Sequence, residues 1–209
     1  MESVDYLTHE VLRLAGNVRG KRVLELGYAN EALSSSFVAQ GATPILIEES
    51  KQRFVEIKRF QEQSELKFEI RHNELADLAF CPAESIDLAI SAISFCGAKD
   101  IARVFRQLQR VLKDQGLLVF GILHPLALHF SSDPSVGGNL GYGSKEMIDG
   151  SSLNGTFPFP LPEKVTIPTF SETFSLLKRS GFSVDQILEL PLAENLAKHP
   201  EIMLIKAHK

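Results

Sequence analysis

A glycine turn between two apolar segments constrains this chain more than any other feature. Residues 23–27 read Val-Leu-Glu-Leu-Gly, and further along the apolar run 45–47 ends at Glu48. This order predicts a strand, a tight turn, a helix, a second strand and an acid, which is the first half of a nucleotide-binding βαβ unit. In such units a glycine lets the backbone approach the ligand, and the acid accepts hydrogen bonds from ribose hydroxyls. We therefore expect a nucleotide-containing cofactor near Gly27.

The turn departs from the usual glycine pattern. Ala29 and Glu31 occupy positions that are commonly glycine, so their side chains fill space that a ligand would need. Glu31 also adds a negative charge close to the expected site. Tyr28 either stacks over the cofactor or fills the cofactor cavity, and the sequence does not rank these two interpretations.

Composition favours one domain and argues against several classes of function. With 209 residues and 44% hydrophobic content, the chain can bury one substantial core, so we expect a single domain over 1–209. The net charge of -4 comes from 22 basic and 26 acidic residues that are well mixed, which argues against nucleic acid as a partner. Cys81 and Cys96 have no Cys/His cluster at ligand spacing, so we expect free thiols and no metal.

The ends and the apolar runs of the sequence bear on where the protein works. Its acidic start does not read as a secretory signal, and no apolar run reaches the roughly 18 residues that a membrane span needs. We therefore expect a cytoplasmic protein without a membrane span. The sequence leaves the oligomeric state open, including a homo-oligomer.

Helical and strand periodicities alternate along the chain. We expect helices at 6–15, 32–40, 51–63, 101–112 and 170–180, and strands at 22–26, 44–47, 68–71, 85–91, 117–122, 184–190 and 202–207. This alternation predicts an α/β fold with a doubly wound, mostly parallel Rossmann-like sheet of about seven strands, helices on both faces and an antiparallel C-terminal edge. Four aromatic side chains are expected to face the core: Phe54, Phe60, Phe105 and Phe174.

A segment rich in glycine and proline follows the fifth expected strand. Residues 131–164 show little periodicity, and loops of this length are usually functional lids or disordered insertions. The segment leaves the carboxyl end of a strand, where open parallel sheets bind their ligands. We expect a lid or substrate insertion around 126–166, with apolar contacts from Tyr142, Phe157 and Phe159.

Taken in order, these segments resemble the class I S-adenosylmethionine-dependent methyltransferases, in particular the type 11 group. Residues 23–27 are similar to the first motif of that family, residues 74–80 to its Asp-Ala-x-x-Leu-Pro-Phe segment, and residues 85–89 to Ser-Phe-Asp-Leu-Val. Residues 110–116 are similar to Arg-Val-Leu-Lys-Pro-Gly-Gly, and residues 122–125 to a common end of the fifth strand. No single segment is specific, but their order and spacing over nearly the whole chain indicate the family.

The resemblance implies S-adenosylmethionine as the cofactor and a small or medium-sized metabolite as the methyl acceptor. It places Glu48 at the ribose hydroxyls and Glu74 at the adenine amino group. Carried over by position, the implied cofactor contacts are, in chain order, Glu25, Gly27, Tyr28, Glu48, Glu74, Leu75 and Ser91. Methyl transfer is an in-line displacement in which the protein mainly aligns the partners, and a base is needed only for a poorly acidic acceptor. His124 is the candidate base.

Other interpretations stay open. Glu25 and Glu48 could cap neighbouring turns, and Glu74 could be a solvated loop acid. His124 could serve only to fix a turn through a backbone hydrogen bond. The whole chain could be a non-catalytic methyltransferase-like protein that binds a partner or a different ligand, which the altered glycine turn favours. A nicotinamide-dependent enzyme is disfavoured because the first turn lacks Gly-x-Gly-x-x-Gly.

Overall fold

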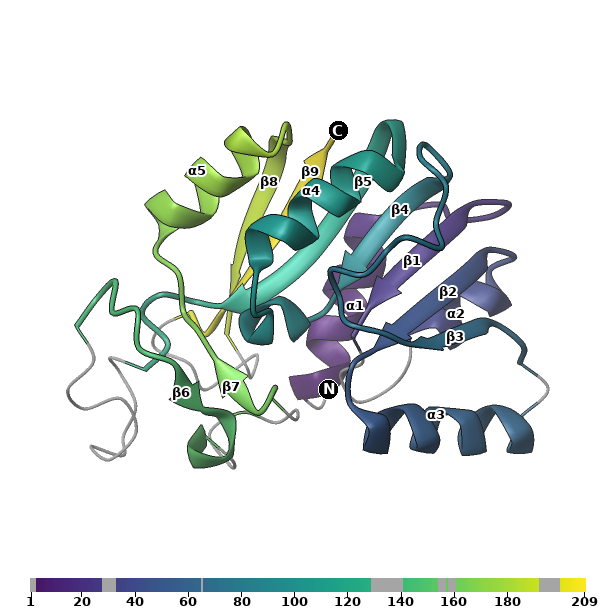
Figure 1. Cartoon of the computed structure of the whole chain (residues 1–209), viewed down its shortest axis with the longest axis horizontal. Coiled ribbons are helices and arrows are strands. Elements are labelled where there is room, and N and C mark those ends of the chain that lie inside the picture. The colour runs from purple at the N-terminus through teal and green to yellow at the C-terminus, as the bar shows by residue number, and fades with distance from the viewer. Residues whose placement is uncertain are drawn as a thin grey trace.

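A seven-stranded mixed sheet forms the centre of the computed structural model (Figure 1). The structure describes residues 3–27, 33–64, 66–128, 141–153, 157, 161–191 and 200–209. The strands of the sheet are β1 (Arg22–Leu26), β2 (Thr43–Glu48), β3 (Glu69–His72), β4 (Ile86–Ser91), β5 (Leu112–Leu123), β8 (Ser183–Leu190) and β9 (Ile202–His208). Their order is β3-β2-β1-β4-β5-β9-β8, parallel from β3 to β5, with β9 antiparallel to both of its neighbours. The predicted sheet and its antiparallel C-terminal edge are confirmed.

Helices lie on both faces of this sheet. They are α1 (Ser3–Ala15), α2 (Leu33–Ala39), α3 (Lys51–Gln63), α4 (Ile101–Val111) and α5 (Phe170–Arg179), with short 3-10 turns η1 (Ser94–Gly97) and η2 (Gly150–Leu153). In Figure 1, α4 and α5 lie in front of the strands, and α1 lies behind them. Polar caps begin several of the helices: the Asp100 carboxylate accepts from Arg103 N at 2.8 Å at the start of α4, and Thr169 forms a capping box with Glu172 at the start of α5. Such caps satisfy the N–H groups that the first turn of a helix leaves unpaired.

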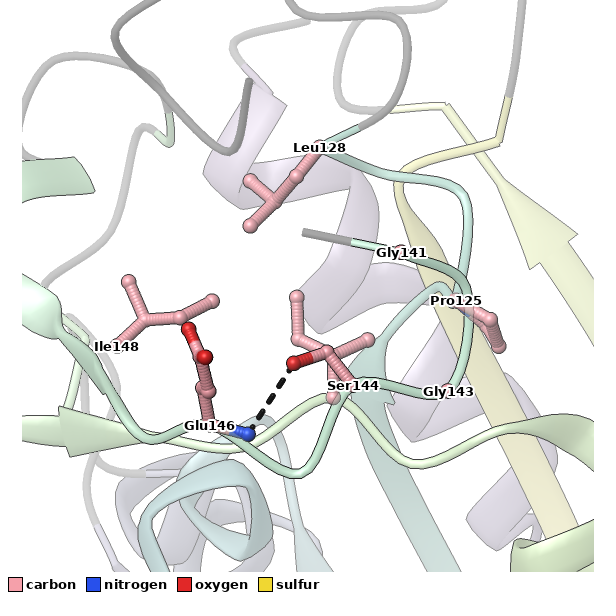
Figure 2. Close-up of a pocket in the computed structure, with 8 residues that line it drawn as sticks. Pro125, Leu128, Gly141, Gly143, Ser144, Glu146 and Ile148 are labelled. Carbon is pink, nitrogen blue, oxygen red and sulfur yellow. Dashed lines mark hydrogen bonds between the residues drawn. The ribbon is translucent and has the colours of Figure 1, made fainter. Parts of the chain in front are cut away.

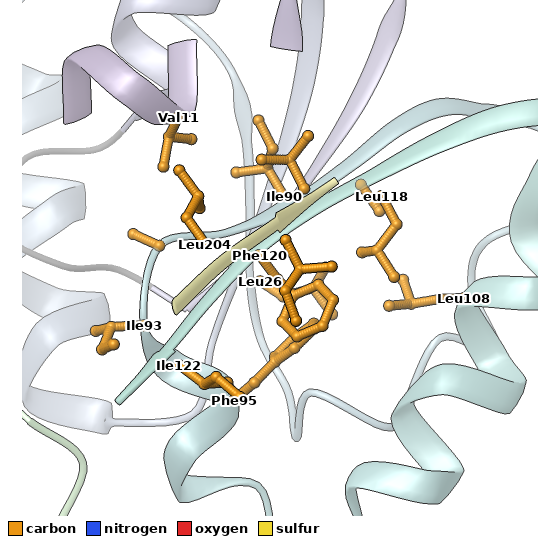
Figure 3. Packing of buried hydrophobic residues seen from close by; sticks show 14 of the residues in the cluster. Val11, Leu26, Ile90, Ile93, Phe95, Leu108, Leu118, Phe120, Ile122 and Leu204 are labelled. Carbon is orange, nitrogen blue, oxygen red and sulfur yellow. The ribbon is translucent and has the colours of Figure 1, made fainter. Parts of the chain in front are cut away.

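The core is continuous through the central strands. Almost every residue of β4 is buried, and so is almost every residue of β5 after Gly116, because helices cover both faces of these strands. Figure 3 shows Val11 of α1 and Leu108 of α4 on opposite sides of the strands. On the α4 side the rings of Phe95, Phe105 and Phe120 form a triangle with centroids 5.3–5.7 Å apart. Tilted and edge-on ring contacts of this kind add to the burial energy.

The core prediction is wrong for two of the four aromatic residues. Phe105 is buried, and Phe54 is half-buried against the ring of His72 at 5.4 Å. Phe60 is 49% exposed and Phe174 is 41% exposed. The physical reason for Phe60 is that α3 lies along β2 and the edge strand β3 and buries only Ile57, so its sheet-facing stripe is narrower than periodicity suggested.

Two segments expected to be irregular form strands. Residues 113–116 continue β5, in which Leu112 pairs with Ile86 before the register shifts. Within the expected loop, β6 (Ile148–Asp149) and β7 (Lys164–Val165) pair antiparallel. Strands as short as β6 and β7 are too short to show a periodicity in the sequence, and the residues that pair are distant along the chain. The other predicted boundaries agree to within one residue, as is usual for element ends, except that α1 begins at Ser3, three residues before the expected start.

Across the described ranges, none of the helices combines the length and the apolar content that a membrane crossing requires.

Candidate functional site

A cleft of about 880 Å³ opens at the carboxyl ends of the parallel strands. Its wall is formed by the residues that follow β2 and β3, by Ser94 and Gly97 of η1, and by Met147 and residues 161–164 of the glycine- and proline-rich segment. The volume falls in the range of about 300–1,000 Å³ that is usual for small-molecule sites. Its place agrees with the rule that open parallel sheets bind ligands beyond the carboxyl ends of their strands.

Gly27 follows the last residue of β1 and packs against Ser94, which lines this cleft. Its φ is 72°, in the left-handed region that favours glycine, and its N–H donates to Ile47 O at 2.8 Å. A Cβ atom built on Gly27 would lie 2.0 Å from Ser94 Oγ, so the residue after β1 and the 3-10 turn η1 can pack this closely because Gly27 has no side chain. The predictions for Tyr28 and for the altered turn up to Glu31 lie outside the described residues.

Glu48 is the last residue of β2 and lies in the cleft wall. The residue is only 4% exposed, and its Oε1 accepts from Ser50 N at 2.7 Å. The Ser50 hydroxyl in turn caps the start of α3. Glu48 therefore both makes the turn-capping contact and lies in the cleft wall. Binding of ribose by Glu48 stays a prediction.

Glu25 is buried behind the cleft wall. Its carboxylate accepts hydrogen bonds from Leu33 N at 3.1 Å, from Ser34 N at 2.7 Å and from the Ser34 hydroxyl. Burial raises the pKa of Glu25 to about 7, although the hydrogen bonds from Ser34 and Leu33 act in the opposite direction. These contacts cap the start of α2, as the alternative interpretation of Glu25 describes, and a contact with cofactor stays a prediction.

Glu74 and Leu75, which were predicted as neighbours at an adenine site, lie in different surroundings. The Glu74 side chain is 61% exposed and lies 3.7 Å from Lys99 Nζ, which suits a solvated loop acid. Leu75 is 3% exposed and lines the cleft, and its N–H donates to Glu49 Oε1 at 2.6 Å. Sequence reasoning missed Glu49, although its position directly after the strand-end Glu48 was a signal.

Two serines lie at different depths near the end of β4: Ser91 is its last residue, and Ser94 begins η1. Ser91 is fully buried, and its hydroxyl has no hydrogen-bond partner within the part of the chain that the structure describes. Ser94 is 8% exposed and lines the cleft against Gly27. Sequence reasoning named Ser91 and missed Ser94, because the 3-10 turn that carries Ser94 has no periodic pattern of its own.

His124, the candidate base, has a contact at each ring nitrogen. Nδ1 accepts from Leu126 N at 3.1 Å, so Nε2 carries the hydrogen that is donated to Glu189 Oε1 at 3.0 Å. The ring is 1% exposed and lies edge-on to Phe170 at 5.2 Å. These contacts favour the interpretation that His124 fixes a turn, and its role as a base stays a prediction.

A small pocket lies beside the turn that follows His124. It measures about 30 Å³ and is lined in part by Pro125, Leu128 and Ser144, as Figure 2 shows. Within it Ser144 Oγ accepts from Glu146 N at 3.3 Å. Such a volume holds roughly one or two water molecules, so this pocket cannot accept a cofactor.

The glycine- and proline-rich segment is anchored on both sides of the cleft. Arg53 Nη2 on α3 donates to Leu161 O at 3.3 Å, and Thr166 N donates to Cys96 O of η1 at 2.8 Å. A Cβ atom built on Gly97 would lie 2.2 Å from the Cβ of Pro162, so η1 and this segment pack closely. Residues 161–166 therefore run across the cleft from α3 to η1.

Both cysteines are free thiols, as predicted, and both are buried. Burial raises the pKa of Cys96 to about 12, which leaves no thiolate at neutral pH. Among the described residues, no three His, Cys, Asp or Glu side chains lie close enough together to hold a metal ion.

Comparison with known sequences finds matches to one family and to one relative. A family described as a methyltransferase domain matches residues 3–186. A stretch of 101 residues is 33% identical to the malonyl-[acyl-carrier protein] O-methyltransferase of Methylovorus sp. strain MP688. That stretch covers 47% of this chain and 34% of the relative, so the match spans about a third of the length of that protein.

Comparison with solved structures shows the same fold over nearly the whole chain. An S-adenosylmethionine-dependent methyltransferase from Mesorhizobium loti superposes with a TM-score of 0.76 at 20% identity, covering 99% of this chain and 98% of that one. The 1,6-didemethyltoxoflavin-N1-methyltransferase of Burkholderia thailandensis, solved with 1,6-didemethyltoxoflavin and S-adenosylhomocysteine, gives 0.68 at 12% identity over 99% and 78%. The magnesium protoporphyrin IX methyltransferase of Synechocystis PCC 6803, with bound SAH, gives 0.65 at 15% over 99% and 81%.

Proposed function

The chain belongs to the methyltransferase domain family, and on that premise we propose that it transfers a methyl group from S-adenosylmethionine to a small or medium-sized metabolite. The observation that carries the proposal is Glu48, a buried acid at the end of β2 in the wall of a cleft of about 880 Å³. Structural relatives that bind S-adenosylhomocysteine in the same fold support it.

The residues of the cleft suit such a cofactor. A carboxylate accepts two O–H donors well, and charge-assisted hydrogen bonds are stronger than neutral ones, so Glu48 would hold the ribose hydroxyls. The left-handed turn at Gly27 brings backbone close to the site, where the methionine part would lie. When bound, the cofactor supplies an electrophilic methyl group, and the protein aligns it with the acceptor.

The acceptor we propose is one whose reacting atom loses its proton easily. The described wall of the cleft contains glutamates and lysines but no histidine. His124 is buried, with a contact at each nitrogen, so proton removal by that ring would require it to break a hydrogen bond. A carboxylate, a thiol or an acidic N–H reacts without a strong base, whereas a simple alcohol does not.

We propose further that 1–209 acts as a single domain whose segment around 126–166 is the lid over the acceptor. Met147, Leu161 and Pro162 supply apolar contacts at the cleft, and Lys164 supplies a charge. The hydrogen bond from Arg53 to Leu161 O supports this assignment, because it holds the segment across the opening. Phe157 is buried, whereas Tyr142 is 54% exposed and Phe159 lies outside the described residues.

Isothermal titration of the purified protein with S-adenosylmethionine and S-adenosylhomocysteine tests the proposal. We expect micromolar binding by the wild type, and a loss of about 1.5–3 kcal/mol of binding free energy in Glu48→Ala because a charged hydrogen-bonding group is removed. Glu56→Ala is the matched control, since Glu56 lies in the same wall and its removal changes the charge equally. Unchanged affinity in Glu48→Ala would remove the ribose assignment.

The same titration separates the enzyme from its alternative. If the folded wild type binds neither compound up to millimolar concentration, the protein is better described as a non-catalytic member of the family that binds a partner or a different ligand.

A further inference from the structure

We infer that Glu49 and the backbone N–H of Leu75 together recognise the adenine edge of the cofactor, with Glu49 in place of Glu74 as the acceptor for the amino group. The inference rests on the proposed function, because it concerns the base of the same nucleoside whose ribose is assigned to Glu48. It adds a specificity-determining residue that the sequence pattern did not indicate.

Glu49 and Leu75 meet across two strand ends in the cleft wall. Both line the cleft, and Glu49 Oε1 accepts from Leu75 N at 2.6 Å. The main chain of Glu49 is held separately, since its carbonyl oxygen accepts from Nε2 of His72 at 3.0 Å on the adjoining strand β3. The Glu49 residue is exposed, so its side chain can rotate while its backbone stays in place.

The pair presents an acceptor beside a donor. The Watson–Crick edge of adenine presents the complementary set, in which the amino group donates and the adjacent N1 accepts. In the structure the two protein groups pair with each other, which satisfies an N–H on the 3% exposed Leu75. Adenine placed between them would replace this one hydrogen bond by two, so recognition would leave neither group unpaired.

Glu74 is less well placed than Glu49 to accept a hydrogen bond from the adenine amino group. Its side chain is 61% exposed and close to Lys99 Nζ, and it is not among the described residues of the cleft wall. Its carbonyl oxygen accepts from Asp77 N at 2.9 Å, which closes a turn and fixes the Glu74 backbone. Glu49 is therefore the carboxylate that shares the cleft with the Leu75 N–H.

This assignment predicts discrimination against a deaminated base. Hypoxanthine has a carbonyl oxygen in place of the amino group and a hydrogen on N1. The Glu49 carboxylate would then face an acceptor, and the Leu75 N–H would face a donor. Sites built to bond a substrate group reject an analogue without it, because the polar groups of the site are left unpaired.

The experiment is isothermal titration of the full chain with S-adenosylhomocysteine and its deaminated analogue, S-inosylhomocysteine. We expect the wild type to bind the adenosyl compound about tenfold tighter or more. In Glu49→Ala the ratio should fall to about a third of the wild-type value or less, because the acceptor for the amino group is gone while the Leu75 N–H still faces N1. Glu74→Ala is the matched control and should keep the wild-type ratio.

The outcomes distinguish this inference from the proposed function. A wild-type ratio in Glu49→Ala, or a ratio lost in Glu74→Ala alone, would overturn the role of Glu49 while S-adenosylhomocysteine binding upheld the function. Wild-type binding of both compounds with equal affinity would also overturn it. If the wild type binds neither compound, the proposed function fails and this inference fails with it.

Discussion

Ser94 lies directly against the α-carbon of Gly27, where an added Cβ atom would sit 2.0 Å from Ser94 Oγ and 2.3 Å from Ser94 Cβ. The turn after β4 therefore packs onto the turn after β1, beside the cleft that Ser94 lines. Since Ser94 is 8% exposed, it has little room to move aside.

Gly27→Ala should destabilise the protein in two ways, through the left-handed φ of this residue and through the close contact with Ser94. The left-handed φ of 72° costs an L-residue about 1–2 kcal/mol, and overpacking adds about 1–3 kcal/mol. Gly20→Ala is the matched control, because Gly20 has a φ of 73° but no atom within 4 Å of the added Cβ. Urea unfolding of both variants measures the difference, and equal losses would show that Ser94 yields without cost.

Glu25 should make stability depend on pH in a specific direction. Burial raises its folded pKa from 4.5 to about 7, so the folded state holds a proton that the unfolded state releases above pH 4.5. The free energy of unfolding should therefore fall as pH rises from about 4.5 to about 7, by up to about 3 kcal/mol. Glu25→Gln should remove this dependence from urea unfolding measured at pH 5 and pH 8. A slope that persists in Glu25→Gln would assign it to other groups.

The main effect of His124→Ala should be a loss of stability rather than a loss of turnover. The substitution removes the acceptor for Leu126 N and the donor to Glu189, and it leaves a cavity beside Phe170. We expect a loss of about 2–4 kcal/mol in the free energy of unfolding. Glu189→Gln, which keeps an acceptor oxygen, should cost far less. If His124 is instead the base, turnover should drop in His124→Ala while unfolding and cofactor affinity stay at wild-type values.

Much of the architecture followed from local patterns. The turn at Gly27 and the strand ending at Glu48 lie where their residue types predicted, and the family and the sheet are confirmed. The exposure of Phe60 could not be predicted, because the sequence shows which face of a helix is apolar but not how much of that face a neighbour covers. The β6–β7 pairing could not be predicted, because strands this short show no periodicity.

The sequence by itself determined the order of the strands and helices, the parallel sheet they form and the strand end that carries Glu48. These depend on periodicity, glycine turns and helix caps, which act between residues close along the chain. Only the tertiary structure decided that Glu49 meets Leu75, that Ser94 meets Gly27 and that Arg53 reaches Leu161. Those contacts join residues 26, 67 and 108 positions apart, and strand register and crossovers bring them together, which local patterns do not encode.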